Sequence, residues 1–528
     1  MVETEDQRST IDLLSNPATY GICGPVERIE THISVIFLVG NKAYKMKKAL
    51  QLPYVDFSTA AIRAEACRKE ISLNSETAPG LYIGLRRITR SADGGLEIDG
   101  SGPLVEAVVE MKRFDQAQLF DRMATSGRLT PALLTETARM IAGYHATAPV
   151  VCAGGGADNI AAVLAINAAG FATSHVFASA DVATFDERLR GLLGRHSSLL
   201  DRRAQEGRVR RCHGDLHLRN ICLLDDRPCL FDCIEFNARI ATIDVLYDLA
   251  FLLMDLWHRG FADFANLIAN RYLDETGDDE GFCLLPFFMA IRAAVRAHVT
   301  ATQAEEPVQD VTRLSDEAKR YFQLANALLD EKPPHLIAIG GLSGTGKSTV
   351  ADRLAPKLGV APGARLVESD RVRKALHGAR AETRLPAAAY TAEASQRIYS
   401  EMARRTQLIV GQESSVVADA VFAKPEDRAL IEHASGNAHF HGIWLDAPRT
   451  DLERRIEARR GSSSDADVTV LAKQLEAEIG VVSWHRIDAS MSADRVVDTI
   501  IECICDPQKR MALSEDSNRT DQVEPIAV

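Results

Sequence analysis

The stretch HGDLHLRN, at residues 213–220, decides how the first half of this 528-residue chain is interpreted. It presents Asp215 and Asn220 in an Asp-x4-Asn spacing, and a second aspartate, Asp232, follows within the apolar segment LFDCIEF. Phosphoryl transfer uses such a set, because one carboxylate aligns the acceptor hydroxyl while an amide and another carboxylate hold Mg²⁺ against the ATP phosphates. The sequence therefore predicts Asp215 as the catalytic base and Asn220 and Asp232 as metal ligands. A loop with polar caps and one buried carboxylate is the competing interpretation.

The Asp-x4-Asn spacing resembles the catalytic loop of eukaryotic-type protein kinases. His-Gly-Asp, with His217 between the aspartate and the asparagine, resembles the aminoglycoside phosphotransferase and choline kinase branch. That resemblance implies an α+β, two-lobed, protein-kinase-like domain that phosphorylates small molecules, although a fold does not fix a substrate. Asp248, in an apolar helical segment downstream, is a candidate to brace the catalytic loop, with a helix-surface or capping role as the alternative.

A phosphate-binding lysine is expected upstream, in the alternating segment THISVIFLVGNKAYKMKKAL, which predicts a hairpin around Gly40. Lys45 in its second strand is our candidate for the lysine that binds the α- and β-phosphates. Lys47 shares the same strand face and stays an alternative, as does a simple solvated face. The helical segment that follows carries Glu65 and Glu70, and Glu70 is the better candidate to pair with the strand lysine.

A second phosphate-binding motif, GLSGTGKST, occupies residues 341–349. It follows the apolar segment HLIAIG and precedes the helical segment STVADRLAPKL, which is the strand–loop–helix context that a P-loop requires. In such a loop the backbone N–H groups cradle phosphates, the lysine reaches the β- and γ-phosphates, and the hydroxyl after it ligates Mg²⁺. The predicted nucleotide-binding residues are Gly341, Ser343, Gly344, Thr345, Gly346, Lys347, Ser348 and Thr349, with Ser348 also a metal ligand.

Segments after the P-loop supply candidate residues for binding the metal and the acceptor of this unit. SSVVADAVF puts Asp419 at the end of an apolar strand, where a metal-binding carboxylate of the Walker B type is expected. SDRVRKALHG puts Asp370 and Arg373 where a strand gives way to a helix. Arg455 and Arg459, at helical spacing, suit closure over phosphates, and surface salt bridges are the competing interpretation. Strands alternating with helices predict an α/β P-loop NTPase domain with a parallel sheet.

This second unit is similar to the small P-loop kinases that include zeta toxins, gluconate kinases and the kinase domain of polynucleotide kinase. The run SDRVRKALHG is the specific link. The resemblance implies that Asp370 activates the acceptor hydroxyl and that Arg373 orients it. The order of both units resembles a bacterial family described as bifunctional aminoglycoside phosphotransferase-like/ATP-binding proteins.

Composition and segmentation set broader limits. The net charge of −12 argues against broad binding to nucleic acids or anionic membranes. No run of eighteen apolar residues occurs, so we expect a cytoplasmic protein without a transmembrane helix. The ten cysteines include no Cys-x2-Cys pair, which argues against structural zinc. The predicted segments are a disordered N-terminus (1–15), a kinase domain (16–320), a helix end and linker (321–334), a P-loop domain (335–507) and a disordered tail (508–528).

Together these features predict a phosphotransferase with two phosphoryl-transfer sites, which uses ATP (or GTP) and Mg²⁺ and acts on small hydroxylated metabolites. Two alternatives stay open. In the first, only the P-loop unit catalyses, and the kinase-like unit binds nucleotide and regulates it. In the second, the chain is a non-catalytic ATP-dependent switch that binds a protein partner. The expected partner is a small-molecule acceptor, with no membrane and no nucleic acid beyond a nucleotide, and the oligomeric state does not follow from the sequence.

Overall fold

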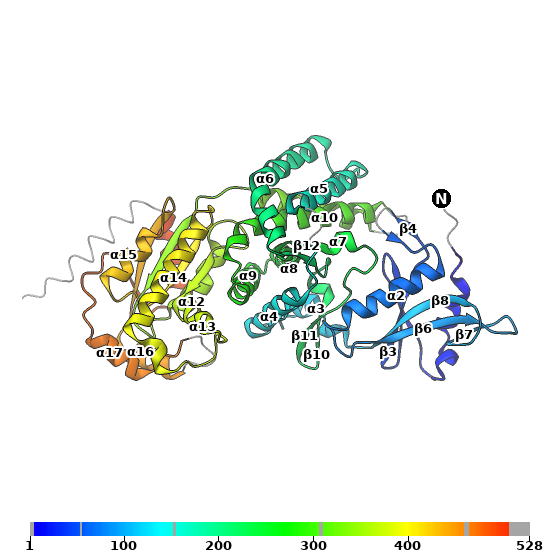
Figure 1. The fold of residues 1–528 in the computed structure, drawn as a ribbon, viewed down its shortest axis with the longest axis horizontal. Coiled ribbons are helices and arrows are strands. Elements are labelled where there is room, and N and C mark those ends of the chain that lie inside the picture. Colours follow the sequence, from blue (N-terminus) through cyan, green and yellow to red (C-terminus); the bar gives the residue numbers. More distant parts are fainter. Residues whose placement is uncertain (1–4, 53–54, 152–154, 306–309, 459–463, 506–528) are drawn as a thin grey trace, which may run out of the picture. The chain divides into compact units, whose positions relative to one another are not determined.

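A computed structural model of the chain describes residues 5–52, 55–151, 155–305, 310–458 and 464–505 (Figure 1). The chain divides into two compact units, Met1–Ala172 with Arg190–Asp255, and Thr173–Leu189 with Leu256–Val528. This packing division differs from the predicted domain limits, because helices α9 (Ala262–Thr276), α10 (Leu285–Ala304) and α11 (Val311–Ala327) belong to the second unit. The predicted tail, 508–528, lies outside the described residues.

The first unit begins with a six-stranded antiparallel sheet in the order β1-β2-β3-β8-β6-β7. The strands are β1 (Glu27–Glu30), β2 (Ser34–Val39), β3 (Lys42–Lys47), β6 (Tyr82–Arg90), β7 (Leu96–Ile98) and β8 (Leu104–Lys112). Successive residues of β2 alternate between two apolar clusters, one with Cys67 of helix α2 (Ala60–Asn74) and one with Leu14 of helix α1 (Arg8–Ser15). The predicted hairpin and the helix after it are therefore confirmed.

The prediction of a disordered N-terminus over residues 1–15 is wrong for residues 5–15. Residues from Arg8 to Ser15 form α1, and Leu14 is fully buried. Gln7 donates a hydrogen bond to the Lys47 carbonyl at 2.9 Å, and Glu5 forms a 2.7 Å ion pair with the buried guanidinium of Arg63. This segment is attached to the sheet and to α2 partly through polar side chains, and such contacts do not show in a hydropathy pattern, which explains the error.

The described rest of the first unit is helical apart from three small two-stranded antiparallel sheets. Strand β4 (Gln51–Leu52) pairs with β5 (Val55–Asp56) in the first, and β10 (Ile221–Leu224) pairs with β11 (Arg227–Leu230) in the second. In the third, β9 (Val209–Arg211) pairs with β12 (Thr242–Asp244). A buried 2.7 Å ion pair between Arg203 and Asp244 joins β12 to a long helix. The helices of this region are α3 (Phe120–Thr125), α4 (Pro131–Thr147), α5 (Gly156–Ala172) and α7 (Ala238–Ala241), with α6 (Ser179–Gln205) from Arg190 on and α8 (Val245–His258) up to Asp255.

The second unit contains a five-stranded parallel sheet in the order β14-β15-β13-β16-β17, which confirms the predicted α/β architecture. Its strands are β13 (His335–Gly340), β14 (Arg365–Glu368), β15 (Val416–Asp419), β16 (His439–Asp446) and β17 (His485–Asp488). The accompanying helices are α12 (Lys347–Leu354), α13 (Ser369–Leu376), α14 (Ala392–Val410), α15 (Pro425–His433), α16 (Arg449–Ala458), α17 (Val468–Glu476) and α18 (Ala493–Cys505). Helices α12 and α18 share one apolar core with the strands.

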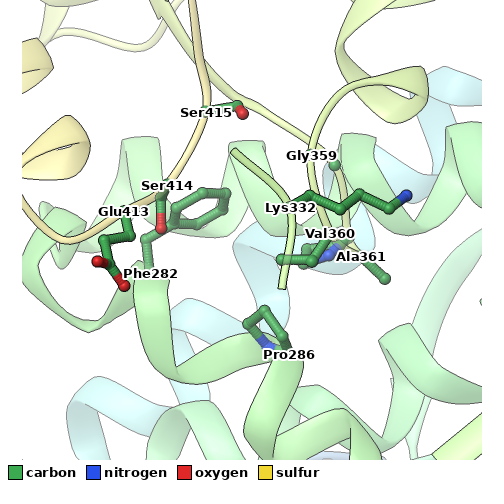
Figure 2. Close-up of a pocket in the computed structure, with 11 residues that line it drawn as sticks. Phe282, Pro286, Lys332, Gly359, Val360, Ala361, Glu413, Ser414 and Ser415 are labelled. Carbon is green, nitrogen blue, oxygen red and sulfur yellow. The ribbon is translucent and has the colours of Figure 1, made fainter. Parts of the chain in front are cut away.

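Helix α9 joins the P-loop sheet through polar contacts at the edge strand β14. Arg365 is 1% exposed, and its guanidinium forms 2.8 Å ion pairs with Asp274 of α9 and with Asp279. Asn270 of α9 accepts a hydrogen bond from the Leu366 N–H at 2.7 Å. Next to this contact, Phe282 and Pro286 line a pocket together with residues 359–363 and 413–415 (Figure 2). These contacts explain why α9 packs with the second unit.

One helical stretch among the described residues, Asp279–Ala304, is long and apolar enough to cross a membrane by length and composition alone. Within it, 67% of the apolar window is buried inside the fold. That degree of burial is typical of the core helix of a globular domain.

Candidate active sites

The predicted catalytic segment, residues 213–220, lies between β9 and β10, and its polar side chains are hydrogen bonded to one another. Asn220 Nδ2 donates hydrogen bonds to Asp215 Oδ2 at 3.0 Å and to the Asp215 carbonyl at 2.9 Å. His217 Nε2 lies 3.3 Å from the same Oδ2. The Asp215 side chain is nevertheless 40% exposed, so its carboxylate is oriented and still open to solvent.

Asp248 of α8 holds the start of this segment, as predicted. Its two carboxylate oxygens accept hydrogen bonds from the backbone N–H groups of His213, at 3.0 Å, and Gly214, at 2.9 Å. Gly214 has a φ of 85°, and a Cβ there would lie 2.9 Å from that of Ala241, so glycine is required at this position. The described part of the chain thus confirms the bracing contact.

The side chains of His145 and Cys212 lie beside Asp248, and their ligand atoms fall within 4.8 Å of one another. All three residues are buried. The Asp248 oxygens already accept backbone hydrogen bonds, and His145 Nε2 lies 3.1 Å from one of them. We therefore interpret this cluster as the support of the catalytic loop rather than as a metal centre.

His213 links the catalytic loop to the segment that carries Asp232. Burial lowers the pKa of His213, which favours the neutral ring. A ring protonated on Nε2 donates to the Phe231 carbonyl at 3.0 Å and accepts the Asp215 N–H on Nδ1 at 3.3 Å. The next backbone group, the Phe231 N–H, donates to the Asn220 carbonyl at 3.1 Å, so the two predicted metal ligands come from adjoining backbone segments.

Asp232 has a left-handed backbone, with a φ of 65°, and its N–H donates to Tyr82 Oη at 3.1 Å. Such conformations are costly for residues other than glycine and cluster at functional sites. The carboxylate is 41% exposed and contacts the Lys45 ammonium. A carboxylate and an amide at this point form an oxygen-rich set that fits Mg²⁺.

Both candidate lysines of β3 bind Glu70, one to each oxygen. Lys45 Nζ lies 2.8 Å from Oε1, and Lys47 Nζ lies 2.7 Å from Oε2. Lys45 also contacts Asp232, whereas Lys47 is 1% exposed and contacts Glu235. The predicted pairing of Lys45 with Glu70 is confirmed, and its phosphate-binding role stays a prediction. Glu235 was missed, and its only signal was an acidic residue in an apolar segment.

The P-loop connects β13 to α12, and Gly346 caps the helix that begins at Lys347. Gly344 has a φ of 90°, and a Cβ there would lie 2.7 Å from the Leu452 carbonyl, which explains this glycine. Lys347 Nζ donates to the Leu342 carbonyl at 3.1 Å, and Thr345 Oγ1 donates to the same oxygen at 2.9 Å. The other predicted members, Gly341, Ser343, Ser348 and Thr349, belong to this loop and the first turn of α12.

Ser348 and Asp419, the two predicted metal ligands, are in contact. Ser348 Oγ donates to Asp419 Oδ2 at 2.5 Å. Burial, together with the nearby Glu368 and Asp370 carboxylates, raises the pKa of Asp419 to about 7, against the opposing effects of Lys347 and Ser348. A hydroxyl beside a carboxylate suits Mg²⁺, whose binding would favour the charged form of Asp419.

The predicted acceptor residues Asp370 and Arg373 occupy the first two turns of α13. Burial raises the pKa of Asp370, while a hydrogen bond with Ser464 acts in the opposite direction. Arg373 is 7% exposed, donates to the Ala389 carbonyl at 2.7 Å and stacks 4.8 Å from the Tyr390 ring centre. Among the described residues, its Nε atom has no hydrogen-bond partner.

Asp465 supports this region and was not predicted. It accepts hydrogen bonds from Lys374 Nζ at 2.8 Å and from the Leu385 N–H at 2.9 Å, and it also contacts the Tyr390 hydroxyl. Although burial opposes the shift, these hydrogen bonds lower the pKa of Asp465. The carboxylate is therefore held in its charged form beside the acceptor residues.

Of the two arginines predicted to close over phosphates, only Arg455 is described. Its guanidinium donates to the Ala489 carbonyl at 2.8 Å and to the Thr345 carbonyl at 3.4 Å, which puts it against the P-loop backbone. Arg459 lies outside the described residues. Gln474 of α17 also reaches the loop, since its Oε1 accepts the Ser343 N–H at 2.9 Å, and no sequence motif had indicated it.

Comparison with known proteins supports the prediction of two units with different folds. Residues 94–282 match the Phosphotransferase enzyme family, and residues 336–478 match the AAA domain family. The chain therefore joins a kinase-type phosphotransferase unit to a P-loop unit, as predicted. An uncharacterized protein of Mycobacterium tuberculosis (strain H37Rv) is 29% identical over 479 residues, which cover 89% of this chain and 93% of that protein. An uncharacterized protein of Mycobacterium bovis matches to the same extent.

Two solved structures are similar to separate parts of the chain. A choline/ethanolamine kinase family protein from Mesorhizobium loti has 16% identity and a TM-score of 0.39, covering 61% of this chain and 93% of its own. A gluconokinase from Sinorhizobium meliloti 1021 has 19% identity and a TM-score of 0.25, covering 36% of this chain and 99% of its own.

Proposed function

We propose that both units transfer the γ-phosphoryl group of ATP to hydroxyl groups of small metabolites in the cytoplasm, with Mg²⁺ as the metal. The observation that carries this proposal is that residues of the types required for the chemistry are in contact within each unit. In the first unit Asn220 is bonded to Asp215, and Lys45 contacts Asp232. In the second, Ser348 is bonded to Asp419.

In the first unit, Asp215 is the group that aligns the acceptor hydroxyl and takes its proton. Lys45 binds the phosphates, and Glu70 fixes the direction of its ammonium group. Asn220 and Asp232 would hold Mg²⁺, which supplies positive charge against the phosphate oxygens. The transition state is loose, so catalysis depends mainly on this alignment and on charge neutralisation.

In the second unit, the P-loop backbone and Lys347 bind the phosphates, and Ser348 and Asp419 would hold the metal. Asp370 takes the acceptor proton, and Arg373 orients the acceptor. Arg455 adds positive charge next to the loop. The two units require separate acceptor sites, since each has its own proton-accepting aspartate.

A second candidate function is catalysis by the P-loop unit alone, with the kinase-like unit binding nucleotide as a regulator. The turn between β1 and β2 favours it, because this turn, Thr31-His32-Ile33, contains no glycine. Thr31 Oγ1 instead accepts the Ser34 N–H at 3.0 Å. A turn of this kind exposes fewer backbone N–H groups to phosphates than a glycine-rich loop does.

The test is ATP consumption by the full chain with Mg²⁺, against sugars, nucleosides and aminoglycosides as acceptors. Wild type is compared with Asp215→Ala and Lys347→Ala. Loss of turnover on different acceptors in the two variants supports two kinases in one chain. If Asp215→Ala keeps wild-type turnover on every acceptor while Lys347→Ala loses it all, the first unit is not catalytic and the second candidate function holds.

A further inference from the structure

One peptide group of the P-loop, between Leu342 and Ser343, makes side-chain hydrogen bonds through both its carbonyl and its N–H. Its carbonyl accepts a hydrogen bond from Lys347 Nζ at 3.1 Å, and its N–H donates to Gln474 Oε1 at 2.9 Å. Because a backbone N–H can only donate, the atom of Gln474 that faces it is the amide oxygen. Peptide planarity makes the two contacts interdependent, since rotation of this peptide moves its N–H and its carbonyl together.

The Ser343 residue is 6% exposed, so this N–H lies where an unsatisfied donor is costly. Among P-loop residues, Lys347 is the one whose ammonium reaches the β- and γ-phosphates. The Leu342 carbonyl to which this ammonium is bonded also accepts hydrogen bonds from Thr345 Oγ1 at 2.9 Å and from the Thr345 N–H at 3.3 Å. Gln474 adds a contact from outside the loop, which holds the N–H end of this peptide.

The segment that carries Gln474 also touches the acceptor side of the same unit. Ser464 is hydrogen bonded to Asp370, and Asp465 accepts from Lys374 and from the Leu385 N–H. Asp467 then caps α17 by accepting the Val470 N–H at 3.0 Å. The described residues from 464 to 476 therefore contact both the phosphate-binding loop and the acceptor residues.

We propose that Gln474 is a positioning residue for the P-loop reaction, acting on Lys347 through the Leu342–Ser343 peptide. It aligns the phosphate lysine, and helix α17 connects that alignment to the segment that holds Asp370. This inference rests on the proposed function of the P-loop unit. It assigns no direct contact between Gln474 and ATP.

A double-mutant cycle on ATP affinity tests it. All chains are full length and carry Lys45→Ala, which weakens the nucleotide site of the first unit. Gln474→Met keeps the side-chain length and removes the acceptor. It is expected to weaken ATP binding roughly tenfold when Lys347 is present and to change nothing when Lys347→Ala is also present. Gln474→Glu retains an acceptor for the Ser343 N–H and is expected to keep near-wild-type affinity.

Gln407 of α14 provides the matched control, because its exposed side chain lies on another helix of the same unit. Gln407→Met should leave ATP affinity unchanged. Equal losses of ATP affinity from Gln474→Met with and without Lys347 would overturn the inference. A folded Gln474→Glu chain that binds ATP poorly would also overturn it. If Gln474→Met does not fold, Gln474→Glu decides alone. If Lys347→Ala itself leaves ATP affinity unchanged, the proposed function of the P-loop unit fails instead.

Discussion

The ammonium group of Lys45 lies 2.8 Å from Oε1 of Glu70, and this pair is buried in the first unit. Although burial opposes both charges, Asp232 and Glu70 raise the pKa of Lys45, and Lys45 and Lys47 lower the pKa of Glu70 to about 2. Both groups are therefore charged at neutral pH. The lysine nearest the candidate metal ligands has a fixed direction, and the following predictions begin with that contact.

Glu70→Gln should reduce the ATP turnover of the first unit by roughly 100-fold, a typical loss for one electrostatic element of an active site. The glutamine amide has one oxygen where the Glu70 carboxylate has two, so it can accept a hydrogen bond from Lys45 or from Lys47 but not from both. Its NH₂ group then faces the remaining ammonium, and the fixed position of Lys45 is lost. Turnover is measured in a Lys347→Ala chain, which isolates the first unit. Glu65→Gln, on the exposed side of the same helix, is the control. Equal turnover in the two variants would contradict the assignment.

Lys47→Met should destabilise the first unit by about 3 kcal/mol, because it leaves the buried Glu235 carboxylate without the cation bonded to it and leaves Glu70 with Lys45 alone. Lys47 is 1% exposed and bonds to Glu70 and Glu235. Its neighbour Lys48 is 30% exposed, so Lys48→Met should change stability by less than about 1 kcal/mol. Urea unfolding of both variants provides the comparison. Similar unfolding midpoints would mean that the Lys47 pair adds nothing to stability.

Mg²⁺-dependent nucleotide binding to the P-loop unit should depend on pH through Asp419. Burial raises the pKa of this carboxyl to about 7, so it binds a proton below that pH. The metal must displace the proton, and each pH unit below about 7 should weaken the apparent Mg²⁺ affinity by roughly tenfold. Titrations between about pH 5 and pH 8 measure this dependence. Asp419→Asn should abolish it, whereas a flat wild-type response would refute it.

The motifs of both sites could be predicted because each holds its chemistry within a few residues. HGDLHLRN contains Asp215 and Asn220, and GLSGTGKST contains the whole phosphate loop. The side chains that support them come from distant parts of the chain. Glu235 lies 188 residues from Lys47, and Gln474 lies 131 residues from Ser343. Periodicity and spacing describe local structure, and they contain no information about such pairs.

The same reasoning explains why the packing units differ from the predicted domain limits. The double proline at 333–334 indicates the end of a helix, and it was used as a boundary. Packing of α9 on the P-loop sheet depends instead on Asn270 and Arg365, which are 95 residues apart. Their polar side chains resemble surface residues until the fold buries them.

Asp248→Asn should lower the turnover of the first unit by roughly 100-fold and leave its ATP affinity nearly unchanged, since small displacements of a catalytic group are costly. The asparagine has one acceptor where the aspartate offers two, so either the His213 or the Gly214 N–H loses its partner. The Asp215 carboxylate then shifts while Lys45 is unaffected. Asp263→Asn, at an exposed position of α9, is the control. Comparable losses in turnover and ATP affinity would point to general unfolding instead.

Arg365→Met should destabilise the second unit by about 3 kcal/mol, because Asp274 and Asp279 would stay buried without their main cation. Burial favours the neutral form of Asp274, and Arg365 is the largest influence that lowers its pKa. Arg404→Met is the control, since Arg404 is 62% exposed and its ion pair is with Glu401 of the same helix. Thermal unfolding of the full chain measures both. If Arg365→Met unfolds at the temperature of Arg404→Met, helix α9 does not stabilise the P-loop sheet through these ion pairs.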